Sequence, residues 1–322
     1  MEMTRQAGAA RPHQKNGRAA QIGSRERAVG TLCGVVSVFL FSSFTLVSRL
    51  GLTSSLSLPD LAALRFGIGG LLLMPVLLRH GLSAVTWREA AALAFFGGLG
   101  FAVFAYAGFS LAPAAHGAVL LHGTLPLFTW AIMGLIQRRH VPRSQVVGIV
   151  LIATGVALMA YDSVAGASPR QLLGDGCLLV ASLLWSSYGV LSRRLGLPPA
   201  QGASIVAVFS MCCFLPVYLL LPAKAILLVG HRELLLQAGV QGVLIGAVSI
   251  FVYTRAVAAL GPDRMALFTA AVPCITTLVA IPLLSEVPSI ADMIGVGAVT
   301  FGMMVALRPI GGASISTRRS RS

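Results

Sequence analysis

Long apolar runs, separated by short stretches that contain charged residues, glycine or proline, make up most of the sequence of 322 residues. A helix of about 20 apolar residues is long enough to cross a hydrocarbon layer of about 30 Å. Ten runs approach that length. The pattern therefore predicts ten membrane-spanning helices, at residues 29–48, 60–78, 90–109, 114–135, 144–161, 174–192, 203–222, 235–256, 264–284 and 290–307.

The run from Ala90 to Gln137 contains no Asp, Glu, Lys or Arg, and it is too long for a single crossing. Proline favours turns and interrupts helices. We therefore expect a tight turn near Pro113 that joins the third predicted helix to the fourth.

Two stretches of the sequence repeat each other. Residues 41–49 read FSSFTLVSR, and residues 185–193 read WSSYGVLSR. Farther along, four residues of the first half recur in the second half at a constant spacing of 147 positions: Tyr106 with Tyr253, Pro126 with Pro273, Gly148 with Gly295 and Gly155 with Gly302. The chain thus contains two related units of five predicted crossings each. Because five is odd, the second unit must run inverted relative to the first, which is typical of alternating-access carriers.

The composition is that of an all-α integral membrane protein. Apolar residues make up 56% of the chain, charged residues make up 11%, and the mean hydropathy is +0.86, whereas a soluble domain is about one quarter charged. The 35 glycines fit helices that approach one another closely in a membrane. The five cysteines lie within apolar runs without the spacing of a metal site or a disulfide framework, so we predict neither a metal nor a cofactor.

The formal net charge of +14 comes from residues at the ends of apolar runs and in two tails. This distribution indicates a lipid bilayer as the partner, and no nucleic acid. With the N-terminus in the cytoplasm, nineteen Lys and Arg residues fall on the inner side and four on the outer side. The positive-inside rule then places both termini in the cytoplasm, in a cell (plasma or inner) membrane.

These observations divide the chain into five parts. We predict a disordered basic cytoplasmic tail at 1–28, a first repeat of five helices at 29–161, an outer loop at 162–173, a second repeat of five helices at 174–307, and a basic cytoplasmic tail at 308–322.

Several of these features occur together in one known family. The first predicted helix ends in SSFTLVSRLGL (42–52), and AALRF (62–66) opens the second. A proline lies near the middle of helices four and nine, and Glu286 and a glycine-rich helix follow the second of them. The chain resembles the EamA family of the drug/metabolite transporter (DMT) superfamily over residues 29–307. In the family pattern a Glu follows the mid-helix proline by thirteen positions, as Glu286 follows Pro273. The chain departs from that pattern in its first half, where Arg139 stands thirteen positions after Pro126. Either a carboxylate used in transport has been lost there, or Arg139 adds to the positive charge of the inner face.

The resemblance implies ten transmembrane helices in two inverted repeats, and a secondary transporter of small organic metabolites (amino acid, nucleobase or drug-like solute) that works as an exporter. An importer of a vitamin-like, flavin-like or anionic metabolite on the same fold is the alternative. An intramembrane enzyme would need a nucleophile with a positioned base, or acidic metal ligands, and the ten acidic residues are scattered or at helix ends. The sequence leaves the substrate, the direction of flux, the coupling ion and the oligomeric state open.

Arg65 is the charged residue that lies deepest within a predicted helix. An ionised side chain inside a bilayer costs about 3 kcal/mol or more unless it is paired or hydrated. Arg65 is therefore a candidate to meet an anionic group of the substrate. The alternatives are a structural pair with Asp60 or Glu286, or a side chain that extends to the interface.

Two residues are candidates for proton coupling. His122 lies about two turns into the fourth helix, and an unperturbed imidazole titrates near pH ~6.5. Packing within the helix is the alternative. Glu286 lies at the outer end of the ninth helix, where it either carries a proton or fixes a loop.

Aromatic and small polar side chains are the remaining candidates for the substrate pathway. Residues three apart lie on the same face of a helix, and by the inverted symmetry the two aromatic pairs in the repeated stretches are expected to face one another across a cavity. Contact between helices or with lipid is the alternative. The candidates are Phe41, Phe44, Trp185, Tyr188, Tyr106, Tyr253, Ser42 and Ser186.

The fifth and tenth helices are rich in small residues and have no charge in their middles. We expect them to lie at the periphery of the bundle, where they are also the candidates for a homodimer contact.

Overall fold

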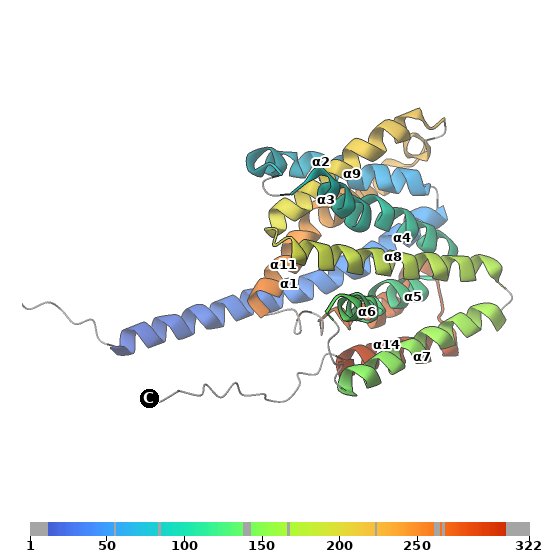
Figure 1. Ribbon diagram of the computed structural model, residues 1–322. Helices are drawn as coiled ribbons and strands as arrows, with labels where there is room; N and C mark the ends of the chain where they lie inside the picture. Colours follow the sequence, from blue (N-terminus) through green and yellow to red (C-terminus); the bar gives the residue numbers. More distant parts are fainter. Residues whose placement is uncertain are drawn as a thin grey trace, which may run out of the picture.

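The computed structural model describes residues 12–54, 56–82, 85–137, 143–165, 168–222, 224–260, 265 and 268–306. Within these ranges the chain forms helices and short connections, and no strand (Figure 1). The predicted basic tail at 308–322 lies outside them.

Apart from the early start of α1, the helices of the first half of the chain follow the predicted runs closely. They are α1 (Pro12–Ser54), α2 (Leu58–His80), α3 (Trp87–Ala94) continued by the π-helical segment η1 (Phe95–Leu99) and by α4 (Gly100–Leu111), α5 (Ala114–His116) continued by the π-helical segment η2 (Gly117–Gly123) and by α6 (Leu125–Gln137), and α7 (Arg143–Ala165). The turn expected near Pro113 is confirmed, because α4 ends at Leu111 and α5 begins at Ala114.

The second half repeats this order. Its helices are α8 (Pro169–Arg194), α9 (Pro199–Leu220), the short 3₁₀ turn η3 (Ala225–Leu227), α10 (His231–Gln237) continued by the π-helical segment η4 (Ala238–Val248) and by α11 (Ser249–Leu260), α13 (Val272–Leu284), and α14 (Ile290–Ala306).

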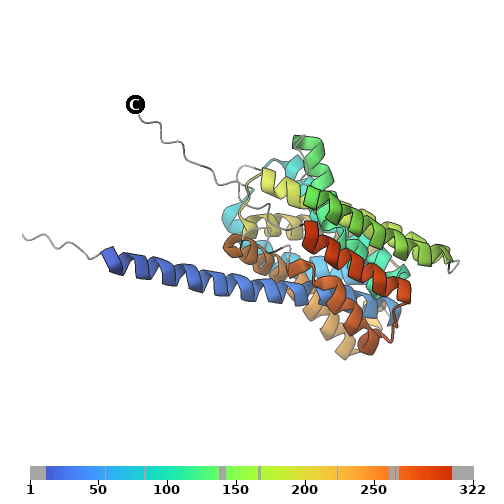
Figure 2. The same cartoon turned by 90° about the horizontal axis from the view of Figure 1, so that it is seen from below.

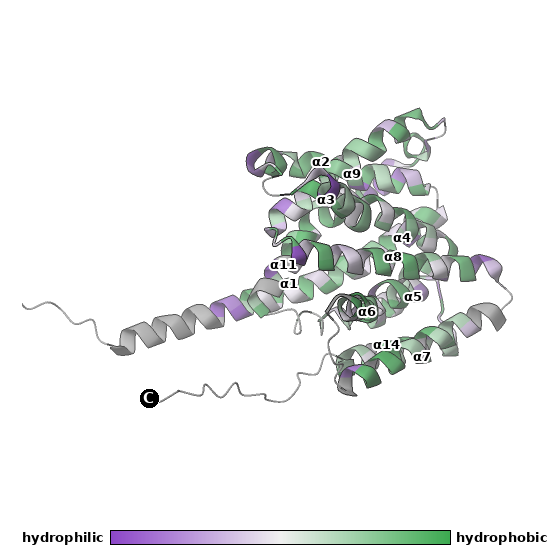
Figure 3. Ribbon diagram, viewed as in Figure 1, coloured by the Kyte–Doolittle hydropathy of each residue, from purple (hydrophilic) through white to green (hydrophobic). Residues whose placement is uncertain are grey.

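Seven helical stretches in the described ranges are long and apolar enough to cross a membrane. They are Arg25–Ser54, Leu58–His80, Trp87–Leu111, Ala114–Leu135, Pro169–Arg194, Pro199–Leu220 and His231–Tyr253. Three shorter apolar helices, Gln145–Tyr161, Val272–Leu284 and Ile290–Ala306, occupy the remaining predicted runs. Green, apolar residues extend over most of these helices (Figure 3). The chain is therefore a multi-pass membrane protein.

Parts of the predicted N-terminal tail and of the predicted outer loop are helical in the structure. Helix α1 starts at Pro12, so residues 12–28 are helical where we expected a disordered tail; Ala, Arg, Gln and Lys in this stretch favour a helix. The outer loop expected at 162–173 is shorter, because α7 continues to Ala165 and α8 begins at Pro169. Ser168 caps α8 by accepting a hydrogen bond from the backbone N–H of Gln171, which fixes this earlier start.

Helices α7 and α14 lie side by side and antiparallel at one edge of the bundle (Figures 1 and 2). Glycines bring them together: a Cβ atom at Gly148 would lie 2.6 Å from the carbonyl oxygen of Gly302, and one at Gly155 would lie 2.8 Å from that of Gly295. Their outer faces expose large apolar side chains such as Val150. The pair is therefore peripheral, as predicted, and its small residues are used in the contact between the two helices.

The other helices pack in pairs around a common core. Helix α2 lies along α9 and η4, α4 lies along α8, and α1 lies along α11 and α13. Phe44 of α1 is at the centre, with its ring centroid 5.3 Å from that of Phe109, 5.9 Å from that of Tyr106 and 6.0 Å from that of Phe101. Elements from both halves of the chain thus enclose one interior.

The contact between α7 and α14 predicts which glycines tolerate a methyl group. In Gly148→Ala the new Cβ would lie 2.5 Å from the Cβ atom of Ala306, so the helices must move apart, and we expect the free energy of unfolding to fall by about 1–3 kcal/mol. Gly297 of α14 is the matched control, because a Cβ there has no neighbour within 4 Å. Thermal unfolding in detergent measures both variants, and an equal melting temperature for the two would contradict this packing.

Candidate transport site

A small cavity of about 40 Å³ lies at the centre of the bundle, between elements of the two halves of the chain. A volume of this size holds only a few water molecules. Its wall is mostly aromatic and aliphatic, with one guanidinium, one imidazole and one hydroxyl group. It is formed by Phe41, Phe44, Arg65, Phe101, Leu121, His122, Leu125, Trp185, Ile245 and Ser249.

Arg65 of α2 is buried, with 8% of its surface exposed. Its guanidinium carbon lies 5.0 Å from the ring centroid of Phe44 and 5.3 Å from that of Phe101. These cation–π contacts stabilise the charge in an apolar setting. Within the described part of the chain, Nη1 of Arg65 has no hydrogen-bond partner and no carboxylate forms a salt bridge with the side chain.

The sequence suggested a structural ion pair of Arg65 with Asp60 or Glu286. That pairing is wrong, because both carboxylates bind other residues. Asp60 accepts hydrogen bonds from the hydroxyl of Tyr218 at 2.7 Å and from the backbone and hydroxyl of Ser57. Glu286 is paired with Arg49 at 2.7 Å. Arg65 therefore presents a buried cation to the cavity.

The aromatic residues divide between the cavity and the packing behind it. Trp185 lines the cavity, and its ring centroid lies 4.8 Å from that of Phe101, which sequence reasoning did not single out. Tyr188, three residues farther along α8, does not line it: its ring packs so closely on Gly97 that a Cβ there would lie 2.6 Å away. Phe41 is a wall residue whose ring stacks on His122 at 5.6 Å.

The remaining candidates lie beside the cavity. The ring of Tyr253 is 5.7 Å from that of Phe41. Tyr106 is fully buried and donates a hydrogen bond from its hydroxyl to Gln241 at 3.0 Å, which links α4 to η4. Ser186 donates to the carbonyl oxygen of Leu125 at 3.3 Å, and Ser42 is buried. None of these four residues is part of the cavity wall described above.

Glu286 fixes the chain at a second site, in the connection between α13 and α14. Its carboxylate accepts hydrogen bonds from Nε of Arg49 at 2.7 Å and from the backbone N–H of Ala114 at 2.6 Å. Arg49 also donates from Nη1 to the carbonyl oxygen of Phe109 at 2.8 Å. Glu286 therefore holds the end of α1, the turn before α5 and the end of α13 together. A cavity of about 190 Å³ adjoins it, lined by Arg49, Pro113, Ala115, Thr277, Ala280, Glu286, Val287, Pro288 and Asp292.

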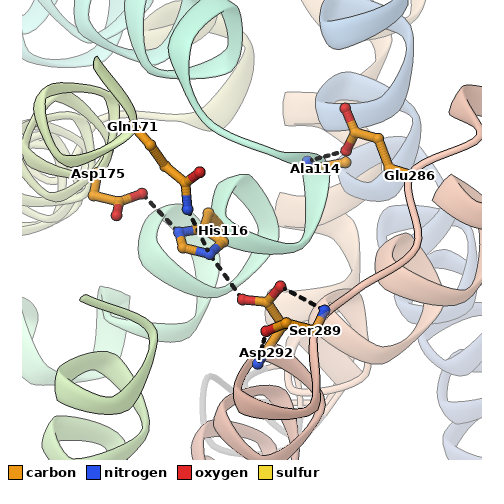
Figure 4. A network of polar contacts seen from close by, with 7 residues as sticks. All are labelled: Ala114, His116, Gln171, Asp175, Glu286, Ser289 and Asp292. Atoms are coloured by element: carbon orange, nitrogen blue, oxygen red, sulfur yellow. Dashed lines mark hydrogen bonds and ion pairs between the residues drawn. The ribbon is translucent and has the colours of Figure 1, made fainter. Parts of the chain in front are cut away.

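A buried imidazole lies next to this cavity, between two carboxylates (Figure 4). Nδ1 of His116 is 2.8 Å from Oδ1 of Asp175, and Nε2 is 2.8 Å from Oδ1 of Asp292. The exposed fractions of the three side chains are 0%, 5% and 8%. Sequence reasoning missed this cluster because Asp175 and Asp292 lie near the starts of predicted helices; an acidic residue within an apolar run was the available signal.

No group of three or more His, Cys, Asp or Glu residues in the described part of the chain is arranged to hold a metal ion. The imidazole itself occupies the space between the two aspartates.

In the described residues, apolar helices surround a central cavity that a buried arginine faces, an arrangement that membrane carriers use. The profile of the EamA-like transporter family matches residues 28–161 and 172–308, so the chain belongs to that family. One solved structure, described only as the crystal structure of a protein, is similar over 87% of this chain and 97% of its own, with 24% identity and a TM-score of 0.59. At that identity it shows the fold alone. No curated protein matches the sequence significantly.

Proposed function

We propose that this protein is a secondary transporter that exports a small organic metabolite across the cell (plasma or inner) membrane by alternating access. The observation that carries the proposal is Arg65, a buried cation that faces a central cavity between the two halves and has no carboxylate partner among the described residues. A cation held in this way stabilises an anionic group of a solute at the middle of the bundle.

The packing of the two halves supports inverted repeats. Gly148 corresponds to Gly295 and Gly155 corresponds to Gly302 in the repeat, and in the structure Gly148 meets Gly302 while Gly155 meets Gly295. Exchanging the two halves turns one contact into the other, and α7 and α14 run antiparallel. A two-fold axis in the plane of the membrane, as inverted repeats require, produces this pattern.

Ten crossings with both termini in the cytoplasm follow from the same arrangement and from the distribution of Lys and Arg. In this orientation the Arg49–Glu286 pair and the 190 Å³ cavity lie at the outer end of the bundle. The central cavity has room for only a few water molecules, so its walls must separate to admit an organic solute. Opposite tilting of the two halves would expose Arg65 to one side of the membrane and then to the other.

The cavity wall favours a planar or aromatic solute that carries an anionic group. Phe44, Phe101 and Trp185 provide apolar ring faces, and Arg65 provides the charge. An aromatic amino acid or a drug-like anion meets this description in full, and a nucleobase meets it through its planar ring. An importer of a flavin-like or other anionic metabolite uses the same contacts, so flux measured in both directions distinguishes the two. An intramembrane enzyme is disfavoured because the buried imidazole contacts two carboxylates and an amide, and no hydroxyl or thiol nucleophile is among these contacts in the described part of the chain.

Replacement of Arg65 tests the site. A thermal-shift screen on the purified protein identifies a solute, and its flux is then measured in vesicles. We expect Arg65→Ala to insert normally and to reduce apparent affinity about 10- to 100-fold, since a charge-assisted hydrogen bond contributes about 1.5–3 kcal/mol. Arg79→Ala, an exposed arginine near the end of the same helix, is the control. Full activity of Arg65→Ala would remove this residue from the site.

The structure does not favour proton coupling at either of the two candidates from the sequence. Glu286 is already paired with Arg49, and the ring of His122 packs on Phe41 in the cavity wall. We therefore expect His122→Gln to leave the pH dependence of transport unchanged in vesicle flux measurements. A flattened pH profile in this variant would instead make His122 the proton relay.

A further inference from the structure

The imidazole of His116 connects both halves of the chain. His116 ends α5 in the first half, whereas Asp175 is in α8 and Asp292 is in α14 of the second half. Each ring nitrogen lies 2.8 Å from one carboxylate oxygen, and the ring itself is not exposed (Figure 4). One side chain thus holds three helices together at the end of the bundle where Glu286 also lies.

The geometry fixes the number of protons in the cluster. A carboxylate oxygen and an unprotonated ring nitrogen are both hydrogen-bond acceptors, so each contact requires one proton between its two atoms. Two contacts require two protons. Either the ring is an imidazolium between two carboxylates, or it is neutral and one aspartate is protonated. In both forms the cluster carries a net charge of −1.

Loss of one proton breaks this arrangement. A neutral imidazole has a single N–H, so one of its nitrogens would face a carboxylate lone pair to lone pair, and the net charge would become −2. Both changes are costly in a buried, poorly solvated site. One of the two contacts is then lost, at the junction of α5 with α8 or with α14.

The surroundings define which groups take part. Gln171 of α8 places its amide nitrogen 3.5 Å from Nε2 of His116. Two charged groups that line the adjoining cavity together with Asp292, Arg49 of α1 and Glu286 before α14, are paired with each other. Helix α13, which also packs against α5, contains no Asp, Glu, His, Lys or Arg. The 190 Å³ cavity reaches Asp292 and gives water a route to the cluster.

We propose that Asp175, His116 and Asp292 form a proton-binding site whose occupied state holds the outer end of the bundle closed. The second proton keeps both contacts intact, and its release to water in the adjoining cavity opens one of them. If the protein transports by alternating access, as proposed above, this site couples proton release to outward opening. The closure itself requires no substrate, so it can be tested without one.

A cysteine inside the adjoining cavity reports the opening. Thr277 is 6% exposed and lines this cavity, and Val287 is 82% exposed at its rim. We would place Thr277→Cys or Val287→Cys in a full-length chain whose five native cysteines are alanine, in vesicles of phosphatidylcholine and phosphatidylglycerol. A thiol reagent that does not cross membranes is applied between about pH 5 and about pH 9. The quantity compared across pH is the labelling rate of Thr277→Cys divided by that of Val287→Cys. Dividing the two rates removes most of the effect of thiol ionisation.

We expect this ratio to rise with pH by up to tenfold per pH unit, the limit for release of a single proton. Asp292→Asn is the matched variant. Its amide can donate to Nε2 of His116 while its oxygen accepts the N–H of Ser289, which Asp292 now accepts at 3.0 Å. Both contacts then persist without the second proton, so the ratio should stay low at every pH.

Asp175→Asn provides a second variant with the same expectation, and thermal unfolding of each variant shows that it is folded. A ratio in the unmodified cluster that does not change with pH would overturn the proposal. So would a pH step in a folded Asp292→Asn or Asp175→Asn variant equal to that of the unmodified cluster. Failure of transport assays would leave these labelling results intact, so failure of the proposed function and failure of this inference are distinguishable.

Discussion

The cost of an unmatched charge inside a bilayer governs how the polar residues of this protein are arranged. Asp60 is held by Ser57 and Tyr218, Glu286 is held by Arg49, and His116 lies between two aspartates. Arg65 differs, because aromatic ring faces support its guanidinium and no carboxylate in the described ranges pairs with it. Asp60, Glu286 and His116, which have polar partners, tie helices together at one end of the bundle. Arg65 faces the central cavity. This division separates residues that hold the fold from the residue best placed to meet a solute.

Close helix contacts provide the frame for that division. Glycines allow α7 and α14 to meet backbone to backbone, and at Gly69 of α2 a Cβ would lie 3.0 Å from the backbone of Gly246 in η4. A bundle held by such contacts and by a few polar links can change conformation when one link opens. The links to Glu286 and His116 both join the first half of the chain to the second.

The helices could be predicted from the sequence because each apolar run is long and is bounded by charge, glycine or proline, and Arg65 and Trp185 do line the cavity. Other parts could not be predicted. Phe101 lies in a uniformly apolar stretch where nothing distinguishes it from its neighbours. Trp185 and Tyr188 are on one helix face by spacing, yet only the packing against Gly97 directs Tyr188 away from the cavity. His116 is 59 positions from Asp175 and 176 from Asp292, and no local pattern carries contacts over such distances.

The account depends on two halves of opposite orientation around a shared cavity, and the membrane sidedness of two loops tests this most directly. Short tags inserted after Ser54, at the end of α1, and after Leu197, between α8 and α9, occupy corresponding places in the two repeats. Labelling by an impermeant reagent in intact cells, before and after the membrane is opened, locates each tag. The account predicts the first tag outside and the second inside. Both tags on the same side would contradict it.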